Sequence, residues 1–211
     1  MYSSYVAVHL VTHPIAQHAL LRIRNASTTP SQFRRLAARL AAIIALEATR
    51  DLATEERTVE TPLEPATGRA LENDIALVPV LRAGLSMVDA VLTLLPDARV
   101  GHVGLQRDEA TAVASRYYLK LPPITGRTTV LVVDPMLATG GSAQAAIDLV
   151  KAAGATDVRL LSIVAAPEGV AYLQSVHPDV EIFTTAVDRQ LNAQKYILPG
   201  LGDFGDRLYG T

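Results

Sequence analysis

VLVVDPMLATGGSAQAA, residues 130–146, is the segment that carries the most information about the architecture. Its first five residues, 130–134, form an apolar run that ends in an acid and predict a buried strand. The paired glycines Gly140 and Gly141 predict a tight loop, and the pattern over 143–153 predicts a helix. A strand, a glycine loop and a helix in this order are typical of one unit of an α/β sheet.

Further apolar runs on both sides of this segment predict a series of strands and helices. We expect strands over 75–80, 98–105, 158–166 and 180–187, and helices ending near Leu94, spanning 143–153 and near 169–176. Ser142 is the expected N-cap of the helix after the glycine loop, and Gly154 is its expected stop. Strands that are apolar on both faces and joined by crossover helices predict a mainly parallel sheet flanked by helices.

The two ends of the chain differ from this central alternation. Apolar residues recur at helical spacing from Phe33 to Leu52, after Ser31 as the expected N-cap, and predict an N-terminal helical cap. Residues 107–122, polar and then aromatic, predict a hairpin that protrudes from the sheet. We expect a single domain over 1–211, divided into an N-terminal helical segment 1–60, an α/β core 75–188 and a C-terminal segment 189–211.

Composition limits the classes of function. The 211 residues are 49% hydrophobic and 19% charged, as expected of a folded domain with a sizeable core. The net charge of −2 argues against a protein that wraps nucleic acid, and the absence of cysteine excludes disulfides and thiolate catalysis. With no signal peptide and no apolar stretch of about 20 residues, we expect a soluble cytoplasmic protein.

The glycine loop has the composition of an anion site. Gly140 and Gly141 let the backbone approach a phosphate, Thr139 and Ser142 add hydroxyl donors, and the helix N-terminus adds free N–H groups. Asp134 would then accept hydrogen bonds from sugar hydroxyls beside that phosphate. The loop has neither the Gly-Lys-Ser/Thr of a P-loop nor the G-x-G-x-x-G of a dinucleotide fold. Ordinary turn glycines between a strand and a helix remain the alternative.

DPMLATGGS (134–142) resembles the phosphoribosyl diphosphate (PRPP) motif of type I phosphoribosyltransferases. Pro135 replaces the second acid found in many members, and this departure resembles the uracil-specific branch. Other segments resemble uracil phosphoribosyltransferases as well, so that the similarity covers almost the whole chain. These segments are EATRDL (47–52), PVLRAGLSMVDAV (79–91), VAAPEGVAYL (164–173), HPDVEIFTTAVD (177–188) and YILPGLGDFGDRLYGT (196–211).

The resemblance implies a role for each matching residue. Arg82 and Arg107 would grip the pyrophosphate of PRPP, for which the charged fork of arginine is suited, while Ala83 and Gly84 leave space for a phosphate. The implied catalytic residues are Asp134, Arg107 and Asp203. The implied PRPP-binding residues are Arg82, Arg107, Asp134, Pro135, Met136, Leu137, Ala138, Thr139, Gly140, Gly141, Ser142 and Asp203. The implied uracil-binding residues are Ile197, Gly202, Asp203 and Phe204, and Phe204 stands where the family often has a small residue.

The implied activity is the joining of uracil to PRPP to form UMP and pyrophosphate, a step of pyrimidine salvage. Mg²⁺ is expected as the cofactor, bound mainly through PRPP and water, without an all-protein metal cage. The five histidines, His9, His13, His18, His102 and His177, have no metal-ligand spacing. The resemblance also implies a homodimer or higher homo-oligomer, with GTP as a candidate effector. The alternatives are a pyrimidine-responsive RNA-binding regulator on the same fold and a phosphoribosyltransferase for another base.

Overall fold

The computed structural model describes residues 8–107 and 114–211; of residues 106, 107 and 114–116 it describes the backbone alone. The central element is a nine-stranded sheet with the order β1–β11–β10–β8–β4–β6–β7, in which β5 also pairs with β4 and β9 with β10. The strands are β1 (Val8–Leu10), β4 (Asp74–Leu81), β5 (Arg99–Val100), β6 (His102–Arg107), β7 (Ala114–Lys120), β8 (Thr128–Val133), β9 (Met136–Leu137), β10 (Asp157–Ala165) and β11 (Glu181–Val187). All pairs are parallel except β6–β7, which confirms the predicted mainly parallel sheet.

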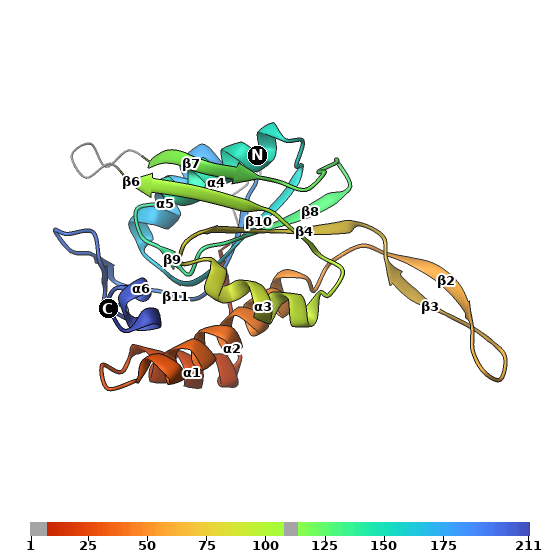
Figure 1. The fold of residues 1–211 in the computed structure, drawn as a ribbon, viewed down its shortest axis with the longest axis horizontal. Helices are drawn as coiled ribbons and strands as arrows, with labels where there is room; N and C mark the ends of the chain where they lie inside the picture. The colour runs from red at the N-terminus through yellow and green to blue at the C-terminus, as the bar shows by residue number, and fades with distance from the viewer. Residues whose placement is uncertain (1–7, 108–113) are drawn as a thin grey trace, which may run out of the picture.

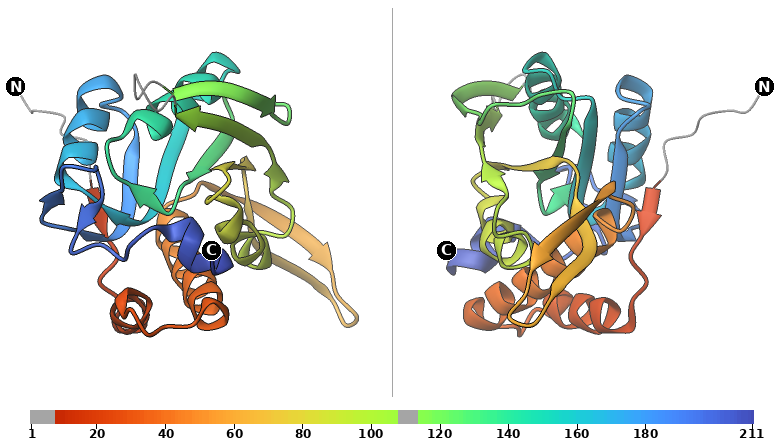
Figure 2. Two further views of the ribbon diagram at one scale, coloured as in Figure 1. Left: turned by 60° about the vertical axis from the view of Figure 1, so that its left-hand side comes forward. Right: turned by 90° about the vertical axis from the view of Figure 1, so that its right-hand side faces the viewer.

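Helices cover both faces of this sheet, as the two views of Figure 2 show. The helices are α1 (Pro14–Arg24), α2 (Pro30–Ala48), α3 (Leu85–Leu94), α4 (Gly141–Ala152), α5 (Pro167–Val176) and α6 (Phe204–Tyr209). Alternate strand residues face opposite ways, so Leu77 and Leu131 pack with α1, α2, α3 and α6. Val78 and Val132 pack on the other side with α4 and α5. The sheet is therefore buried on both faces, which explains its continuous apolar strands.

Three predicted boundaries were wrong, each for a local reason. The N-cap of α2 is Thr29 rather than Ser31, because Pro30 already occupies the first turn and Thr29 and Gln32 form a capping box. The N-cap of α4 is Gly140 rather than Ser142, so the helix begins earlier and Ser142 lies in its first turn. The strand predicted over 98–105 is interrupted at Gly101 and so forms β5 and β6, although the Gly101 N–H still bonds to the Leu77 carbonyl of β4 in the same register.

The protruding hairpin is a different segment from the predicted one. β2 (Thr54–Glu60) and β3 (Pro65–Leu71) form a two-stranded ribbon that extends away from the body. The helical segment expected over 1–60 thus ends in a strand. The expected hairpin 107–122 corresponds to β6–β7, but β7 continues the main sheet at its edge; residues 108–113 lie outside the described part of the chain.

The C-terminal segment folds back on the N-terminal helices. After β11 it forms the small antiparallel pair β12 (Gln190–Leu191) and β13 (Ile197–Leu198), and then α6, which packs against α2. Figure 1 shows this blue segment beside the red α1 and α2, below the ends of the central strands. Within the described residues, no helix combines the length and apolar character needed to cross a membrane.

Candidate active site

A small hollow of about 200 Å³ lies at the carboxyl end of β8, where the glycine loop begins. It is lined by Asp134, Met136, Leu137, Ala138, Thr139, Gly140, Ser142 and Ala143. Of the predicted PRPP-binding residues in the segment 134–142, Pro135 and Gly141 are not among them. Pro135 is buried and its carbonyl accepts hydrogen bonds from the N–H groups of Ile163 and Val164, and Gly141 opens α4. The hollow therefore brings together most of the residues expected around a phosphate, directly before a helix N-terminus.

Helix α5 packs against the loop that lines this hollow. Gly140 has φ +88°, and a Cβ there would lie 2.8 Å from Cδ1 of Tyr172 and 3.1 Å from the carbonyl oxygen of Gly169. A Cβ on Gly169 would lie only 2.3 Å from the carbonyl oxygen of Ala138. The Tyr172 hydroxyl donates to Oε1 of Gln144 on α4 at 2.5 Å. Two glycines thus allow α5 to contact the loop backbone, and this contact fixes the shape of the loop.

Asp134 lines the hollow, and its carboxyl has a raised pKa. Part of the residue faces the hollow, but burial of the carboxyl raises its pKa from 3.8 to about 7, against a hydrogen bond from the Met136 main chain that lowers it. Its own main chain is fixed by a hydrogen bond from Asp134 N to the Leu161 carbonyl and by one from the Ser162 hydroxyl to the Asp134 carbonyl. A carboxyl with a perturbed pKa in a concave site is a typical functional group.

This acidity predicts a pH dependence of stability in the substrate-free protein. Because the folded-state pKa of Asp134 lies above the unfolded value, the folded chain binds the proton more tightly between pH 3.8 and about 7. The contribution of Asp134 to the free energy of unfolding is therefore present below that window and is lost as pH rises through about 7. Urea unfolding at several pH values should show that Asp134→Asn gains stability relative to the wild type as pH rises. A difference between the two proteins that does not change with pH would contradict the raised pKa.

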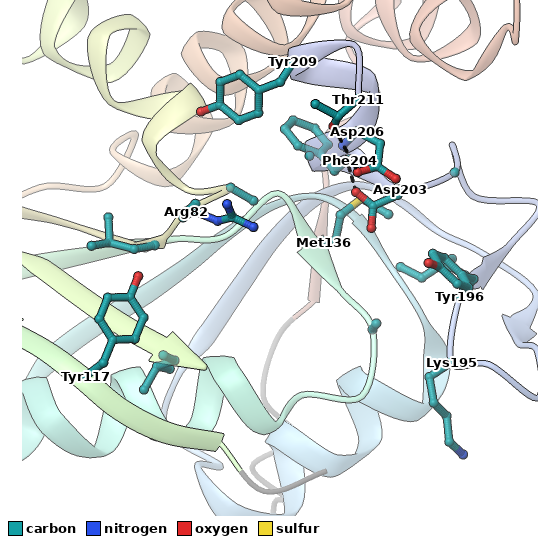
Figure 3. A pocket seen from close by; sticks show the side chains of 17 residues that line it. Arg82, Tyr117, Met136, Lys195, Tyr196, Asp203, Phe204, Asp206, Tyr209 and Thr211 are labelled. Carbon is teal, nitrogen blue, oxygen red and sulfur yellow. Dashed lines mark hydrogen bonds between the residues drawn. The ribbon is translucent and has the colours of Figure 1, made fainter. Parts of the chain in front are cut away.

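A larger cleft of about 970 Å³ adjoins the hollow, since Met136 and Ala138 line both. The cleft is lined by Leu81, Arg82, Ala83, Leu105, Tyr117, Met136, Ala138, Lys195, Tyr196, Ile197, Gly202, Asp203, Phe204, Gly205, Asp206, Tyr209 and Thr211. In Figure 3 Arg82 and Asp203 face the same open space from opposite sides, and the Tyr117 hydroxyl points into it. The cleft lies beyond the carboxyl ends of the parallel strands, where open α/β sheets bind their ligands.

The loop after β4 places Arg82 at this cleft. Arg82 is exposed and follows the buried strand directly, and the Leu81–Arg82 peptide is cis. Gly84 has a different role from the predicted one, because a Cβ there would lie 2.4 Å from the Val133 carbonyl oxygen. The missing side chain of Gly84 thus makes room for protein backbone, and Ala83 is the small residue that borders the cleft. Arg107 ends β6, but its side chain lies outside the described part of the structure.

The C-terminal turn forms the other wall of the cleft. Ile197 is buried, whereas Gly202 and Asp203 are exposed, and the Asp203 carboxylate caps α6 by accepting from the Asp206 N–H at 2.9 Å. The unusual Phe204 is only 3% exposed and packs edge-on against Phe33, with ring centroids 5.0 Å apart. The ring of Phe204 is therefore fixed in the core.

Several cleft residues were not found by the sequence analysis. Tyr117 reaches the cleft because β7 pairs with β6, and Tyr209 and Thr211 reach it because α6 folds back. No local motif signals the position of Tyr117. Tyr196, Asp206, Tyr209 and Thr211 lie within the C-terminal segment 196–211 that resembles the family, so their position in that motif was the available signal.

The described residues contain no group of three or more histidine, cysteine, aspartate or glutamate side chains placed to hold a metal ion. Asp203 and Asp206 nevertheless line the cleft on the side opposite Arg82. Mg²⁺ favours phosphate oxygens and water over a cage of protein ligands. The donor set therefore fits a metal that enters with a phosphate-bearing ligand.

Comparison with known families supports the sequence resemblance. The family model described as uracil phosphoribosyltransferase matches residues 10–211. The uracil phosphoribosyltransferase of Dictyoglomus thermophilum is 51% identical over 205 residues, which cover 97% of this chain and 99% of that protein. The enzyme of the same name from Thermus thermophilus is also 51% identical, with the same coverage of both chains.

Solved structures agree with the fold. The AQ2163 protein of Aquifex aeolicus superimposes with a TM-score of 0.93 at 36% identity, covering 97% of this chain and 99% of that one. A hypoxanthine-guanine phosphoribosyltransferase of Bacillus anthracis gives a TM-score of 0.50 at 11% identity, over 75% of this chain and 80% of that one. The second likeness concerns the fold alone.

Proposed function

This chain belongs to the uracil phosphoribosyltransferase family, and we propose that the two adjoining cavities divide its substrates between them. The enzyme transfers the phosphoribosyl group of PRPP to uracil, giving UMP and pyrophosphate. In our proposal the small hollow holds the 5′-phosphate of PRPP, and the large cleft holds the ribose, the pyrophosphate and uracil. Membership of this family favours uracil over another base as the substrate, and it favours an enzyme over an RNA-binding regulator.

One observation carries the division of the site. The hollow and the cleft share Met136 and Ala138, so a ligand with a phosphate in the hollow can extend into the cleft without leaving the protein surface. Gly140 and the N-terminus of α4 face the phosphate end. Arg82 and the C-terminal turn face the opposite end. The combined site therefore offers room for an extended ligand with anionic groups at both ends and a base beside it.

The proposed chemistry uses charge and position rather than a covalent nucleophile. Pyrophosphate leaves C1′ of the ribose, and uracil N1 attacks the cationic sugar that results. Arg82, and Arg107 in the family pattern, stabilise the negative charge that grows on the pyrophosphate. The Asp134 carboxylate accepts hydrogen bonds from the ribose hydroxyls, and Asp203 faces the positive charge that develops at the sugar.

Mg²⁺ completes the proposal as the cofactor that neutralises pyrophosphate charge when it enters with PRPP. Phosphate oxygens and water supply most of its ligands, and no direct protein ligand is assigned. Asp203 and Asp206, which line the cleft, would accept hydrogen bonds from water around such an ion.

Asp134→Asn tests the role of the hollow in the reaction. Loss of a charged hydrogen-bond acceptor should lower kcat/KM for PRPP by about 1.5–3 kcal/mol in transition-state stabilisation, or roughly 10- to 150-fold. The assay is UMP formation from uracil, PRPP and Mg²⁺. Asp74→Asn is the matched control, since Asp74 begins β4 at the other end of the sheet and pairs with Arg99 in solvent. Near-normal kcat/KM for Asp134→Asn would reject the assignment.

We infer that the protein is a single domain, located in the cytoplasm, and that it assembles into a homodimer or higher homo-oligomer. The β2–β3 ribbon supports self-association, because Leu63 at its tip is 96% exposed and Val59 is 55% exposed. An isolated two-stranded ribbon is marginally stable in water, so a second copy would stabilise it. GTP as an effector rests on the family resemblance alone.

A further inference from the structure

The last residue of α1 contacts a loop that lies far away in the sequence. Arg24 forms a two-pronged ion pair with Asp188, which follows β11: Nη2 lies 2.6 Å from Oδ1 and Nη1 lies 2.7 Å from Oδ2. The side chains are 20% and 6% exposed, respectively. A carboxylate buried to this degree is costly unless it is paired and hydrogen-bonded, so this contact differs from an ordinary surface ion pair.

The same ion pair binds both main-chain polar groups of Gly200. Nη1 of Arg24 donates to the Gly200 carbonyl at 2.6 Å, and the Gly200 N–H donates to Oδ2 of Asp188 at 2.8 Å. Arginine and aspartate thus form a closed ring of hydrogen bonds with one peptide segment. We name this arrangement, formed by Arg24, Asp188 and Gly200, the Gly200 clamp.

The main chain at Gly200 is tightly constrained. Its φ is +57°, and a Cβ there would lie 2.1 Å from the carbonyl oxygen of Ile197. The chain therefore folds back tightly between Ile197 and Gly200, and any movement of Gly200 displaces the neighbouring residues. Ile197 and Gly202, on either side of it, line the cleft.

A second arginine fixes the next residue of the turn to the same end of α1. Nη1 of Arg207 donates to the carbonyls of Leu201 at 2.8 Å and Ile23 at 2.7 Å, and Nη2 donates to the carbonyl of Asn25 at 2.6 Å. Side chains therefore bind both main-chain polar groups of Gly200 and the carbonyl of Leu201. These two residues lie between Ile197 and Gly202, which line the cleft.

We propose that Arg24 and Asp188 are positioning residues for base recognition, which act by holding the main chain of the turn 197–202 in the shape that reads uracil. Neither residue lines the cleft, so both act through Gly200 rather than by touching the substrate. The inference rests on the proposed function of the turn as the uracil site. It predicts that loss of the clamp weakens uracil recognition selectively and leaves PRPP binding intact, because the hollow is built on β8, α4 and α5.

Steady-state kinetics of Asp188→Asn, Arg24→Lys and Arg24→Met test this inference. Asp188→Asn and Arg24→Met each remove a charged hydrogen-bond partner, so KM for uracil should rise by about tenfold or more while KM for PRPP stays within about twofold. Arg24→Lys keeps the charge but loses the fork, and should give an intermediate rise. The ratio of kcat/KM for uracil to that for cytosine should fall in the same order, because a looser turn discriminates less.

Arg159→Lys is the matched control for the loss of a buried arginine. Arg159 is 6% exposed and donates to one main-chain carbonyl, that of Ala48, and to carboxylates. Arg24 likewise binds one carbonyl and one carboxylate, but Arg159 lies on β10, away from the turn. This variant should melt at a lower temperature with both KM values unchanged. Asp188→Asn should differ from it in the uracil KM and in the base ratio.

Gly200→Ala separates failure of the clamp from failure of the base site. If this variant raises KM for uracil and the clamp variants only lower the melting temperature, the clamp is a structural tie and the inference is wrong. If all four variants leave KM for uracil unchanged, the turn is not the base site and the proposed function of the turn fails too. Equal rises of both KM values in Asp188→Asn and Arg24→Lys would also overturn a selective role.

Discussion

Cytosine is expected to be a poorer substrate than uracil by a factor of about 10⁴ or more in kcat/KM. The turn YILPGLGDF (196–204) offers no Asn, Gln or Arg side chain to read a base edge. Main-chain groups of Ile197, Gly202 and Phe204 are the remaining partners, and all three residues line the cleft. The Gly200 clamp and Arg207 hold the intervening peptides, so the turn presents fixed donors and acceptors.

The physical reason is the pattern of polar groups on the base. Uracil presents N3–H between two carbonyl oxygens, which fits one fixed acceptor flanked by two donors. Cytosine has an acceptor at N3 and a donor at its 4-position, so like groups would face each other at both places. A site that leaves such buried groups unpaired can discriminate by about 10⁴ or more.

5-Fluorouracil is the matched control for this measurement. Fluorine at C5 leaves the polar edge unchanged, and the ring of Phe204 is fixed against Phe33 in the core. We therefore expect 5-fluorouracil to be accepted. The values of kcat/KM for the three bases should be compared at saturating PRPP. Turnover of cytosine within about tenfold of uracil would show that the polar edge is read loosely, contrary to a main-chain site.

Gly140→Val should weaken PRPP binding by roughly 100-fold. A β-branched residue at φ +88° costs about 1–3 kcal/mol in backbone strain. Its side chain would also meet Tyr172 and the Gly169 carbonyl, so the loop would have to move away from α5. Displaced N–H groups would then lose charged hydrogen bonds to the phosphate, each of about 1.5–3 kcal/mol.

Two other variants make the result of Gly140→Val specific. Thr139→Ser keeps the hydroxyl and the loop backbone, so it should bind PRPP far better than Gly140→Val. Gly126→Val controls for a β-branched residue in a turn, since Gly126 has nothing within 4 Å of its Cβ position. In calorimetric titration with PRPP, Gly126→Val and Thr139→Ser should therefore both show a higher affinity than Gly140→Val. Equal affinity of Thr139→Ser and Gly140→Val would refute the role of the glycine.

The parts of the fold that follow from local sequence were predictable. The strand at 128–133 and the helix at 141–152 carry clear apolar patterns, and their order determines a parallel unit. The β2–β3 ribbon was missed because TEERTVE, residues 54–60, has no apolar face: six of its seven residues are exposed. A strand that packs against nothing leaves no alternation in the sequence.

The candidate site was predictable where its residues are consecutive. DPMLATGGS gave most of the hollow, and the C-terminal motif gave Ile197 and Gly202. Tyr117 could not be predicted, because its place in the cleft depends on strand pairing and register. The contact between Arg24 and Asp188 joins residues 164 positions apart. Arg24 belongs to no quoted motif, and HPDVEIFTTAVD, which ends at Asp188, does not signal the contact.

The contact between the two ends of the chain also orders events during biosynthesis. Translation delivers the glycine loop, residues 134–143, well before Asp188, Gly200 and Arg207. Their partners at the end of α1 are made near the start: Arg24 for Asp188 and Gly200, and the Ile23 carbonyl for Arg207. A nascent chain that has reached Ala165 therefore holds every residue of the hollow and none of the turn 197–202. Domains emerge from the ribosome in this order, with the N-terminal part first. With the turn as the proposed base site, the ability to choose a base is the last property that the growing polypeptide acquires.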